Sequence, residues 1–148
     1  TQKARLIMLI GISPLLGPDL LHTLRAMGHG DEIALVDGNY PAAEHARRLI
    51  RADGIALMPL LAAILKVLPV EAAFRAALNN TPPQVGPIHQ AVDTLCAASG
   101  QSFSVTPLLG EALYPRVRGA YAIVATSEPA LFANVILRKA ALAIDLDG

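Results

Sequence analysis

GHGDEIALVD, residues 28–37, links the end of one predicted helix to a complete predicted strand. Pro18 suits a first helical position, and leucines recur after it at helical spacing, so we expect a helix over residues 18–27. Gly28 is typical of the left-handed stop that follows a last helical turn. Residues 32–36 then form a short apolar run bounded by turn residues, which predicts a strand that enters the core.

Two polar residues mark the ends of this strand. His29 leaves the helix on a turn, and Asp37 follows the last strand residue, where turn-forming residues lead into solvent. Loops at strand ends commonly carry function, so His29 and Asp37 are candidate site residues. The structural alternatives are a histidine that only interacts with the helix dipole and an Asp-Gly pair that only makes a turn.

The rest of the chain alternates segments of helical period with short β-like runs, which predicts an α/β fold in which helices flank one sheet. The expected helices cover residues 18–27, 58–66 and 87–99, and Gly100 is the expected stop of the last. The expected strands cover residues 6–12, 32–36, 70–77, 102–106, 121–125 and 134–137. The alanines of the third strand suit a helix equally well. Because the turn-rich segment 79–84 is too short to divide the chain, we expect one domain over residues 1–148.

Composition argues against several classes of protein. Lysine plus arginine and aspartate plus glutamate number 12 each, so no basic field would attract nucleic acid. Charged residues make up 16% of the chain, against about 25% in an average globular protein, which favours association. An alanine-rich interior with ordinary polar cover would give similar values. The longest apolar run, 55–65, contains Pro59 and falls short of the roughly 18 residues that span a bilayer. The apolar start lacks a small-residue cleavage site, so we expect no membrane segment and a cytoplasmic location.

Metal and nucleotide sites also lack support in the sequence. His22, His45 and His89 have no histidine or cysteine three or four residues away, so we expect no metal site and interpret them as surface or capping residues. His45, with the arginines that follow it, is a candidate for a pocket mouth. The pair Gly28 and Gly30 follows a helix rather than a strand, which disfavours a dinucleotide loop. Cys96 lies among apolar residues at helical spacing, typical of a core residue rather than a nucleophile.

The chain resembles the L-fucose mutarotase and D-ribose pyranase family nearly from end to end. The resemblance rests on the order and spacing of five motifs: ISPLL at 12–16, MGHGDE at 27–32 with Asp37, IRADG at 50–54, AYAIVAT at 120–126 with Glu128, and ANVILRK at 133–139. It implies a sheet with flanking helices and a cofactor-independent isomerase that acts on a monosaccharide. It also implies assembly into a homo-oligomeric ring, with a decamer as one expected size.

The resemblance assigns roles to particular residues. Mutarotation removes the proton of the anomeric hydroxyl and gives a proton to the ring oxygen, and a histidine can do both because its unperturbed pKa is near 6.5. His29 is therefore the expected catalytic acid and base. Asp37, Phe132, Ala133 and Asn134 are the expected sugar-binding residues, since a carboxylate accepts and an amide both donates and accepts hydrogen bonds.

The sequence departs from the family pattern at several positions. Phe132 stands where family members often carry tyrosine. Gly110 aligns with a basic sugar-contacting residue of the fucose branch when Tyr114 and Arg116 are matched to the tyrosine and arginine of that branch. Gly110, Tyr114 and Arg116 are therefore further candidate binding residues, with Arg116 or Arg118 as substitutes for the missing guanidinium. The family glycine before Glu128 is a serine here, and the glycine after the last strand is an alanine. These departures leave the preferred sugar open and keep one alternative: a non-catalytic sugar-binding module that assists uptake or regulation.

Overall fold

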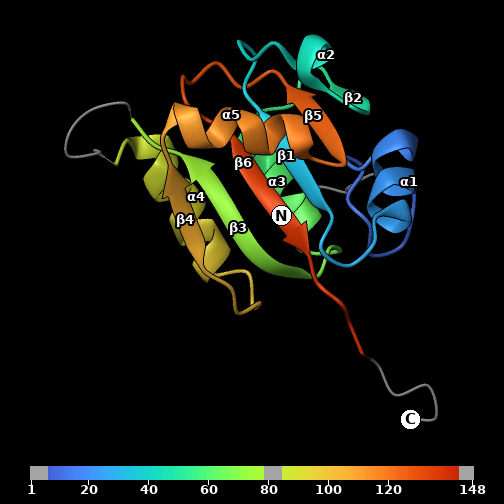
Figure 1. Cartoon of the computed structure of the whole chain (residues 1–148). Coiled ribbons are helices and arrows are strands. Elements are labelled where there is room, and N and C mark those ends of the chain that lie inside the picture. Colours follow the sequence, from blue (N-terminus) through green and yellow to red (C-terminus); the bar gives the residue numbers. More distant parts are fainter. Residues whose placement is uncertain (1–6, 79–84, 144–148) are drawn as a thin grey trace, which may run out of the picture.

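The computed structural model describes residues 7–78 and 85–143, and its centre is one six-stranded mixed sheet (Figure 1). The strands are β1 Glu32–Val36, β2 Leu49–Ala52, β3 Val70–Ala76, β4 Val105–Leu108, β5 Ala122–Thr126 and β6 Val135–Lys139. The helices are α1 Pro18–Ala26, α2 Ala42–His45, α3 Leu57–Leu65, α4 Pro87–Ala97 and α5 Gly110–Gly119. The expected α/β fold with helices flanking one sheet is confirmed.

The strand order is β2-β5-β1-β6-β3-β4. Only β6 runs antiparallel to its neighbours, β1 and β3, and all other pairs are parallel. The carboxyl ends of β1, β3 and β4 therefore lie at the same edge of the sheet, where β6 begins. Loops at the carboxyl ends of parallel strands commonly form ligand sites, so this edge is where a site is expected.

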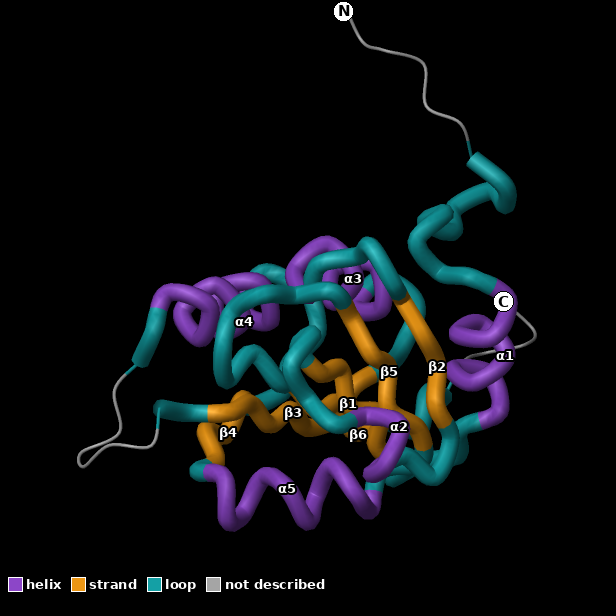
Figure 2. The backbone as a smooth tube through the Cα atoms, turned by 90° about the horizontal axis from the view of Figure 1, so that it is seen from above, coloured by secondary structure: helices purple, strands orange, loops and turns teal. Residues whose placement is uncertain are grey.

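The helices cover both faces of the sheet (Figure 2). Apolar side chains of α1, α3 and α4 pack in one cluster with one face, whereas α2 and α5 pack in a second cluster with the other. β5 is buried along its whole length, and β1 is buried after its first residue. Strands covered on both faces show continuous apolar runs rather than alternation, which is why β1 and β5 are the easiest strands to read in the sequence.

Most expected elements are present, with small shifts at their ends. The strand over 70–77 is confirmed as β3. The expected strand 102–106 corresponds to β4, which begins three residues later, at Val105. Three elements were not expected. β2 and α2 span only four residues each, and α5 has a glycine at both ends with Pro115 inside. Such residues are typical of loops, so the pattern conceals the α5 helix.

The expected strand over residues 6–12 is wrong for the residues that the structure describes. Residues 7–12 form a turn, with a single bridge between Leu9 and Ile12 and with Gly11 at φ +75°. Ile10 is 95% exposed. A β-like sequence forms a strand only beside a partner strand, and among residues 7–78 and 85–143 none of the six strands pairs with this segment. Leu6 and the expected loop 79–84 lie outside the described residues.

The expected role of Gly28 as the left-handed helix stop is also wrong. The helix ends at Ala26, and the positive φ of +88° occurs at Gly30 instead. The Gly28 N–H donates to Asp31 Oδ2 at 2.7 Å, which closes the turn that carries His29. Gly100, by contrast, has φ +84° after α4, as expected of a stop.

Candidate functional site

A buried group of hydrogen bonds joins the end of β1 to the start of β6. The Asp37 backbone N–H donates to Asn134 Oδ1 at 3.0 Å, and Asp37 Oδ2 accepts the Ala133 N–H at 3.3 Å. Asp37 Oδ1 accepts the Asn39 N–H at 2.9 Å. Asp37, Ala133 and Asn134 are each at most 5% exposed. The structure thus brings together three of the expected sugar-binding residues, although Asp37 and Asn134 are 97 positions apart in the chain.

These bonds fix how the polar groups are presented. Because Asn134 Oδ1 faces the Asp37 N–H, its NH₂ group is directed away from that backbone and is a donor. The Asp37 carboxylate holds two backbone N–H groups, and each oxygen keeps a further lone pair. The arrangement can therefore offer a sugar hydroxyl both a charged acceptor and an amide donor.

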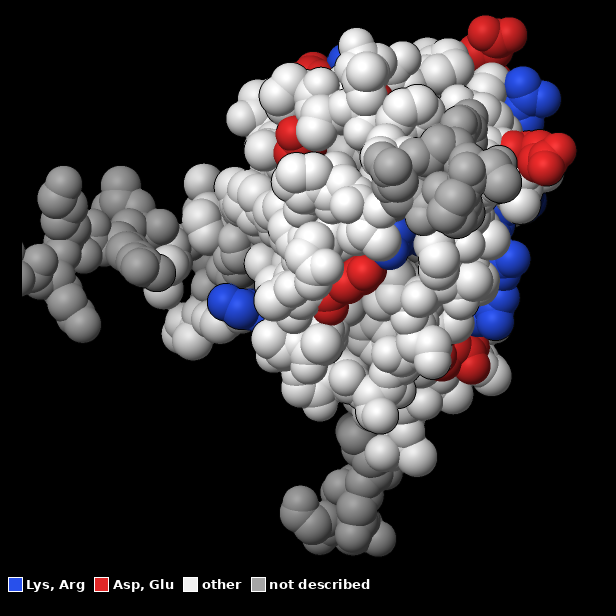
Figure 3. Space-filling model, turned by 90° about the vertical axis from the view of Figure 1, so that its left-hand side faces the viewer, with Lys and Arg blue, Asp and Glu red and all other residues white. Residues whose placement is uncertain are grey.

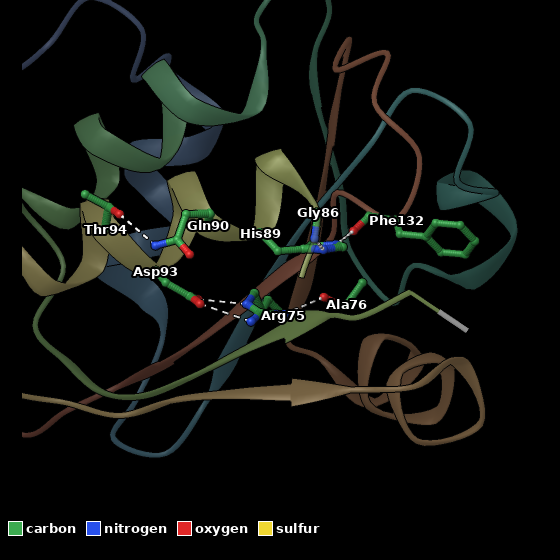
Figure 4. A network of polar contacts seen from close by, with 8 residues as sticks. All are labelled: Arg75, Ala76, Gly86, His89, Gln90, Asp93, Thr94 and Phe132. Atoms are coloured by element: carbon green, nitrogen blue, oxygen red, sulfur yellow. Dashed lines mark hydrogen bonds and ion pairs between the residues drawn. The ribbon is translucent and has the colours of Figure 1, made fainter. Parts of the chain in front are cut away.

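Phe132 comes directly before this group of bonds and has φ +58°, the left-handed region. That conformation is rare for a bulky residue, and such strained positions cluster at functional sites. The Phe132 carbonyl accepts a bond from His89 Nε2 at 2.9 Å, while its ring points away from His89 (Figure 4). The ring is half-buried and packs against the apolar cluster beneath α5. It supplies a flat apolar face without a hydroxyl.

His29 lies at the other end of the sheet. Its turn precedes β1, and the neighbouring Gly30 N–H donates to the Lys139 carbonyl, at the end of β6. The His29 side chain is 61% exposed, and its Nε2 lies 3.0 Å from Glu71 Oε1. β1 spans five residues, which is about 16 Å of extended chain. One copy of the chain therefore does not bring His29 and Asp37 into contact.

The three further candidates differ in their surroundings. Gly110 begins α5 immediately after β4, at the same sheet edge as Asp37. Tyr114 is exposed, and its ring lies 5.9 Å from the ring of Tyr40. Arg116 does not replace the missing guanidinium at that edge, because it makes two hydrogen bonds with Glu32 at the start of β1, at 2.9 and 2.8 Å.

A cluster of polar side chains lines a groove of about 480 Å³ between α2 and α5. Arg118 Nη2 lies 2.9 Å from His45 Nε2, and because a guanidinium only donates, His45 Nε2 accepts. His45 Nδ1 then carries the proton and donates to the Tyr40 hydroxyl at 2.8 Å. Burial and then the neighbouring Tyr114 raise the pKa of Tyr40 to about 12. His45 thus lines a groove, but the two arginines expected beside it, Arg47 and Arg48, do not, and Arg118 takes that place.

A second cleft, of about 370 Å³, adjoins this groove and includes Asp37 among its lining residues. The two share Pro41, and the second also contains Tyr40, Arg51 and Thr126. The cleft therefore gives solvent a route to the buried group of bonds at the end of β1.

Two buried residues cap helices. His89 is 2% exposed, so its interpretation as a surface residue is wrong, although it does cap α4 by accepting the Gly86 N–H. Its position three residues after Gly86, at the start of a helix, is the sequence signal for this cap. Glu128 accepts the Leu57 N–H at 3.2 Å and so caps α3 from the loop after β5.

Within residues 7–78 and 85–143, no group of three histidine, cysteine, aspartate or glutamate side chains is arranged to hold a metal ion. The helices in this part of the chain are all too short or too polar to cross a membrane. Cys96 is buried, as expected for a core residue.

Comparisons with known proteins agree on one family. Residues 10–142 match the model of the RbsD / FucU transport protein family. The fucose mutarotase of Bos taurus is 36% identical over 150 residues, which cover 93% of this chain and 97% of that protein. The L-fucose mutarotase of Haemophilus influenzae is 37% identical over 140 residues, which cover 89% of this chain and 96% of that protein. The crystal structure of the fucose mutarotase in complex with L-fucose from Streptococcus pneumoniae superposes with a TM-score of 0.84 at 37% identity, covering 91% of this chain and 100% of that chain.

Proposed function

Because the chain belongs to the RbsD / FucU transport protein family, we propose that it is a monosaccharide mutarotase that interconverts the anomers of L-fucose or a related sugar. The observation that carries this function is its 37% identity, over 91% of the chain, to a fucose mutarotase whose structure contains L-fucose. The reaction is an isomerisation without net oxidation or group transfer, and acid–base groups alone can catalyse it.

In the proposed mechanism, His29 exchanges protons with the sugar. Removal of the anomeric hydroxyl proton and delivery of a proton to the ring oxygen open the ring, and closure on either face of the carbonyl gives either anomer. Asp37, Phe132, Ala133 and Asn134 hold the sugar. The Asp37 carboxylate accepts and the Asn134 amide donates hydrogen bonds, while the Phe132 ring covers apolar C–H groups.

This mechanism needs two copies of the chain. Because β1 separates His29 from Asp37, His29 of one copy must reach the sugar held at Asp37 of another. We therefore propose a homo-oligomer in which each site is shared by two subunits. Closed symmetric assemblies are the usual form of such oligomers, and a ring, with a decamer as one candidate size, would repeat the same contact between neighbours.

Two surface features support association. Ile7, Met8, Leu9 and Ile10 are all more than half exposed, in a segment with the sequence of a strand. The face drawn in Figure 3, on the side where α4 and β4 lie in Figure 1, carries few lysine, arginine, aspartate or glutamate side chains. Contiguous exposed apolar residues mark interaction surfaces. We also propose that residues 1–148 act as one domain in the cytoplasm.

The second candidate function is a sugar-binding module without catalysis. Two departures from the family pattern favour it: Gly110 stands where the fucose branch carries a basic residue, and Phe132 stands where family members often carry tyrosine. Anomer-exchange NMR decides between the two on a panel of fucose, ribose, galactose and rhamnose. Faster anomer exchange of at least one sugar supports the mutarotase, whereas sugar binding without faster exchange supports the binding module. If the protein neither binds any of these sugars nor speeds their exchange, both functions are overturned.

A further inference from the structure

We propose that His89 is a positioning residue for sugar binding, which it assists by holding the backbone of the loop 132–134 from α4. This inference rests on the proposed sugar-binding role of that loop. His89 is the third residue of α4 and is 2% exposed, and its two ring nitrogens bond to two different backbone groups (Figure 4). Its side chain is bonded to the backbone of that loop and does not line the cleft that contains Asp37.

The two bonds define the protonation state of His89. The Gly86 N–H donates to Nδ1 at 3.1 Å, so Nδ1 carries no proton. Nε2 then carries the proton of the neutral ring and donates to the Phe132 carbonyl at 2.9 Å. The tautomer is thus fixed by the helix start, and it presents a donor to the loop.

The loop needs this donor because Phe132 is held at φ +58°. A bulky residue is strained in the left-handed region, so external contacts must hold it there. His89 holds the Phe132 carbonyl on one side, and Asp37 Oδ2 holds the next N–H, that of Ala133, on the other. The peptide group between Phe132 and Ala133 is therefore bonded at both its oxygen and its nitrogen. Its orientation positions Asn134, the residue directly before β6.

Helix α4, which carries His89, is itself held firmly against the sheet. One helical turn further along α4, Asp93 accepts two hydrogen bonds from Arg75 of β3, at 2.7 and 3.0 Å. Arg75 is 4% exposed, and its Nη1 also donates to the Ala76 carbonyl. A bidentate pair of this kind fixes both distance and orientation, so α4 cannot slide along β3 without breaking it. Figure 4 shows this pair and His89 on the same side of the helix.

Two amide variants separate the two bonds of His89. In His89→Gln the terminal NH₂ takes the place of Nε2 and can donate to the Phe132 carbonyl, but the acceptor for Gly86 is lost. In His89→Asn the amide oxygen takes the place of Nδ1 and can accept the Gly86 N–H, but the donor to Phe132 is lost. A residue that only caps the helix would tolerate asparagine better than glutamine. A positioning residue would show the reverse in sugar binding.

We expect His89→Asn to raise the KM for fucose anomer exchange about five- to tenfold, with kcat changed less than about twofold, because one loop-holding hydrogen bond is lost. His89→Gln should keep KM within about twofold of wild type. Both variants are also unfolded in urea, so that loss of the cap is measured separately. Equal KM values in the two variants, or a larger rise in His89→Gln, would overturn the inference.

Two measurements decide the inference even if the wild-type protein exchanges no sugar anomers, a result that would instead remove the proposed function. Hydrogen–deuterium exchange of the peptide covering residues 132–134 should be faster in His89→Asn than in His89→Gln, and equal rates contradict the inference. Long-range ¹H–¹⁵N spectra of the wild-type protein should show the Nε2–H tautomer of His89. The Nδ1–H tautomer would contradict the inference. This measurement uses the wild-type protein and so does not depend on whether a variant folds.

Discussion

Asn134 accepts the backbone N–H of Asp37 at 3.0 Å, so the start of β6 is bonded directly to the end of β1. These two residues are the polar centre of the proposed sugar site, and neither lies in a flexible surface loop, since each is 5% exposed. A pre-organised pair of this kind lets a ligand bind without first ordering its contacts.

His29→Ala should lower the enzyme-catalysed rate of fucose anomer exchange by about 100-fold or more, because it removes the proposed acid and base. Its side chain is 61% exposed, so the fold should persist. Saturation-transfer NMR measures the rate, and His22→Ala, an exposed histidine on α1, is the matched control. An unchanged rate in folded His29→Ala would remove His29 from the mechanism.

Mixing two inactive variants should restore activity if each site is shared by two subunits. His29→Ala subunits keep an intact Asp37–Asn134 group, and Asn134→Ala subunits keep His29. After equal mixing and reassembly, about a quarter of the sites should combine both intact parts in a closed symmetric assembly. The measurement is anomer exchange before and after mixing, with light scattering to give the assembly mass. A mixture as inactive as its components, or a wild-type mass of one chain, argues against the shared site.

Asp37→Asn should both weaken sugar binding and lower the free energy of unfolding by about 1–3 kcal/mol. The reason is that Asp37 accepts backbone N–H groups on both carboxylate oxygens, whereas an asparagine has only one acceptor and would turn its NH₂ toward a donor. Urea unfolding and sugar titration measure the two effects. Wild-type stability in the variant would mean that the carboxylate does not hold the loop.

Tyr40 should make the stability pH-dependent at high pH. Burial raises its pKa from the ordinary value of 10.0 to about 12, so folding favours the protonated phenol. The stabilising effect is complete below pH 10 and is lost as the pH rises through 12. The free energy of unfolding of the wild type, relative to Tyr40→Phe, should therefore fall over this range. A constant difference between pH 8 and pH 12 would contradict the assignment.

Phe132→Tyr should strengthen the handling of ribose relative to fucose. The phenylalanine ring can cover sugar C–H groups but cannot bind a hydroxyl, and ribose has fewer other contacts to orient it. One added neutral hydrogen bond is worth about 0.5–1.5 kcal/mol, or roughly two- to twelvefold. Anomer exchange is compared for ribose and fucose in both proteins. A ratio that tyrosine leaves unchanged would move the explanation of specificity to the loop around Gly110.

The sequence predicted those helices and strands whose burial and ends are determined by residues close by in the chain. β1, buried on both faces, was predicted to the residue, and the helix starting at Pro87 was predicted from apolar residues at helical spacing, with Gly100 as its stop. α5 was missed because Pro115 and its terminal glycines imitate a loop. The segment 6–12 was misread because strand formation depends on a partner, which local sequence does not reveal.

The candidate site was predictable to a similar degree. Asp37 is predicted at the end of one strand and Asn134 at the start of another, but their common edge of the sheet follows only from the antiparallel pairing of β1 with β6. His29 and Asp37 lie at opposite ends of the strand that the sequence predicts, so their separation follows from that strand. His89 could be interpreted only as a surface or capping residue, because its second bond reaches a loop 43 positions away.

The central place of β6 determines when the sheet can form during synthesis. In the sheet, β6 lies between the strands β2-β5-β1 and the strands β3-β4. In addition, β1 and β2 both pair with β5, which is synthesised long after them. Until residues 122–139 leave the ribosome, β1 and β3 present unpaired apolar edges, which are the usual starting points of aggregation. The nascent chain should therefore depend on chaperones until late in translation, and truncation before β6 should give insoluble fragments rather than smaller folded ones.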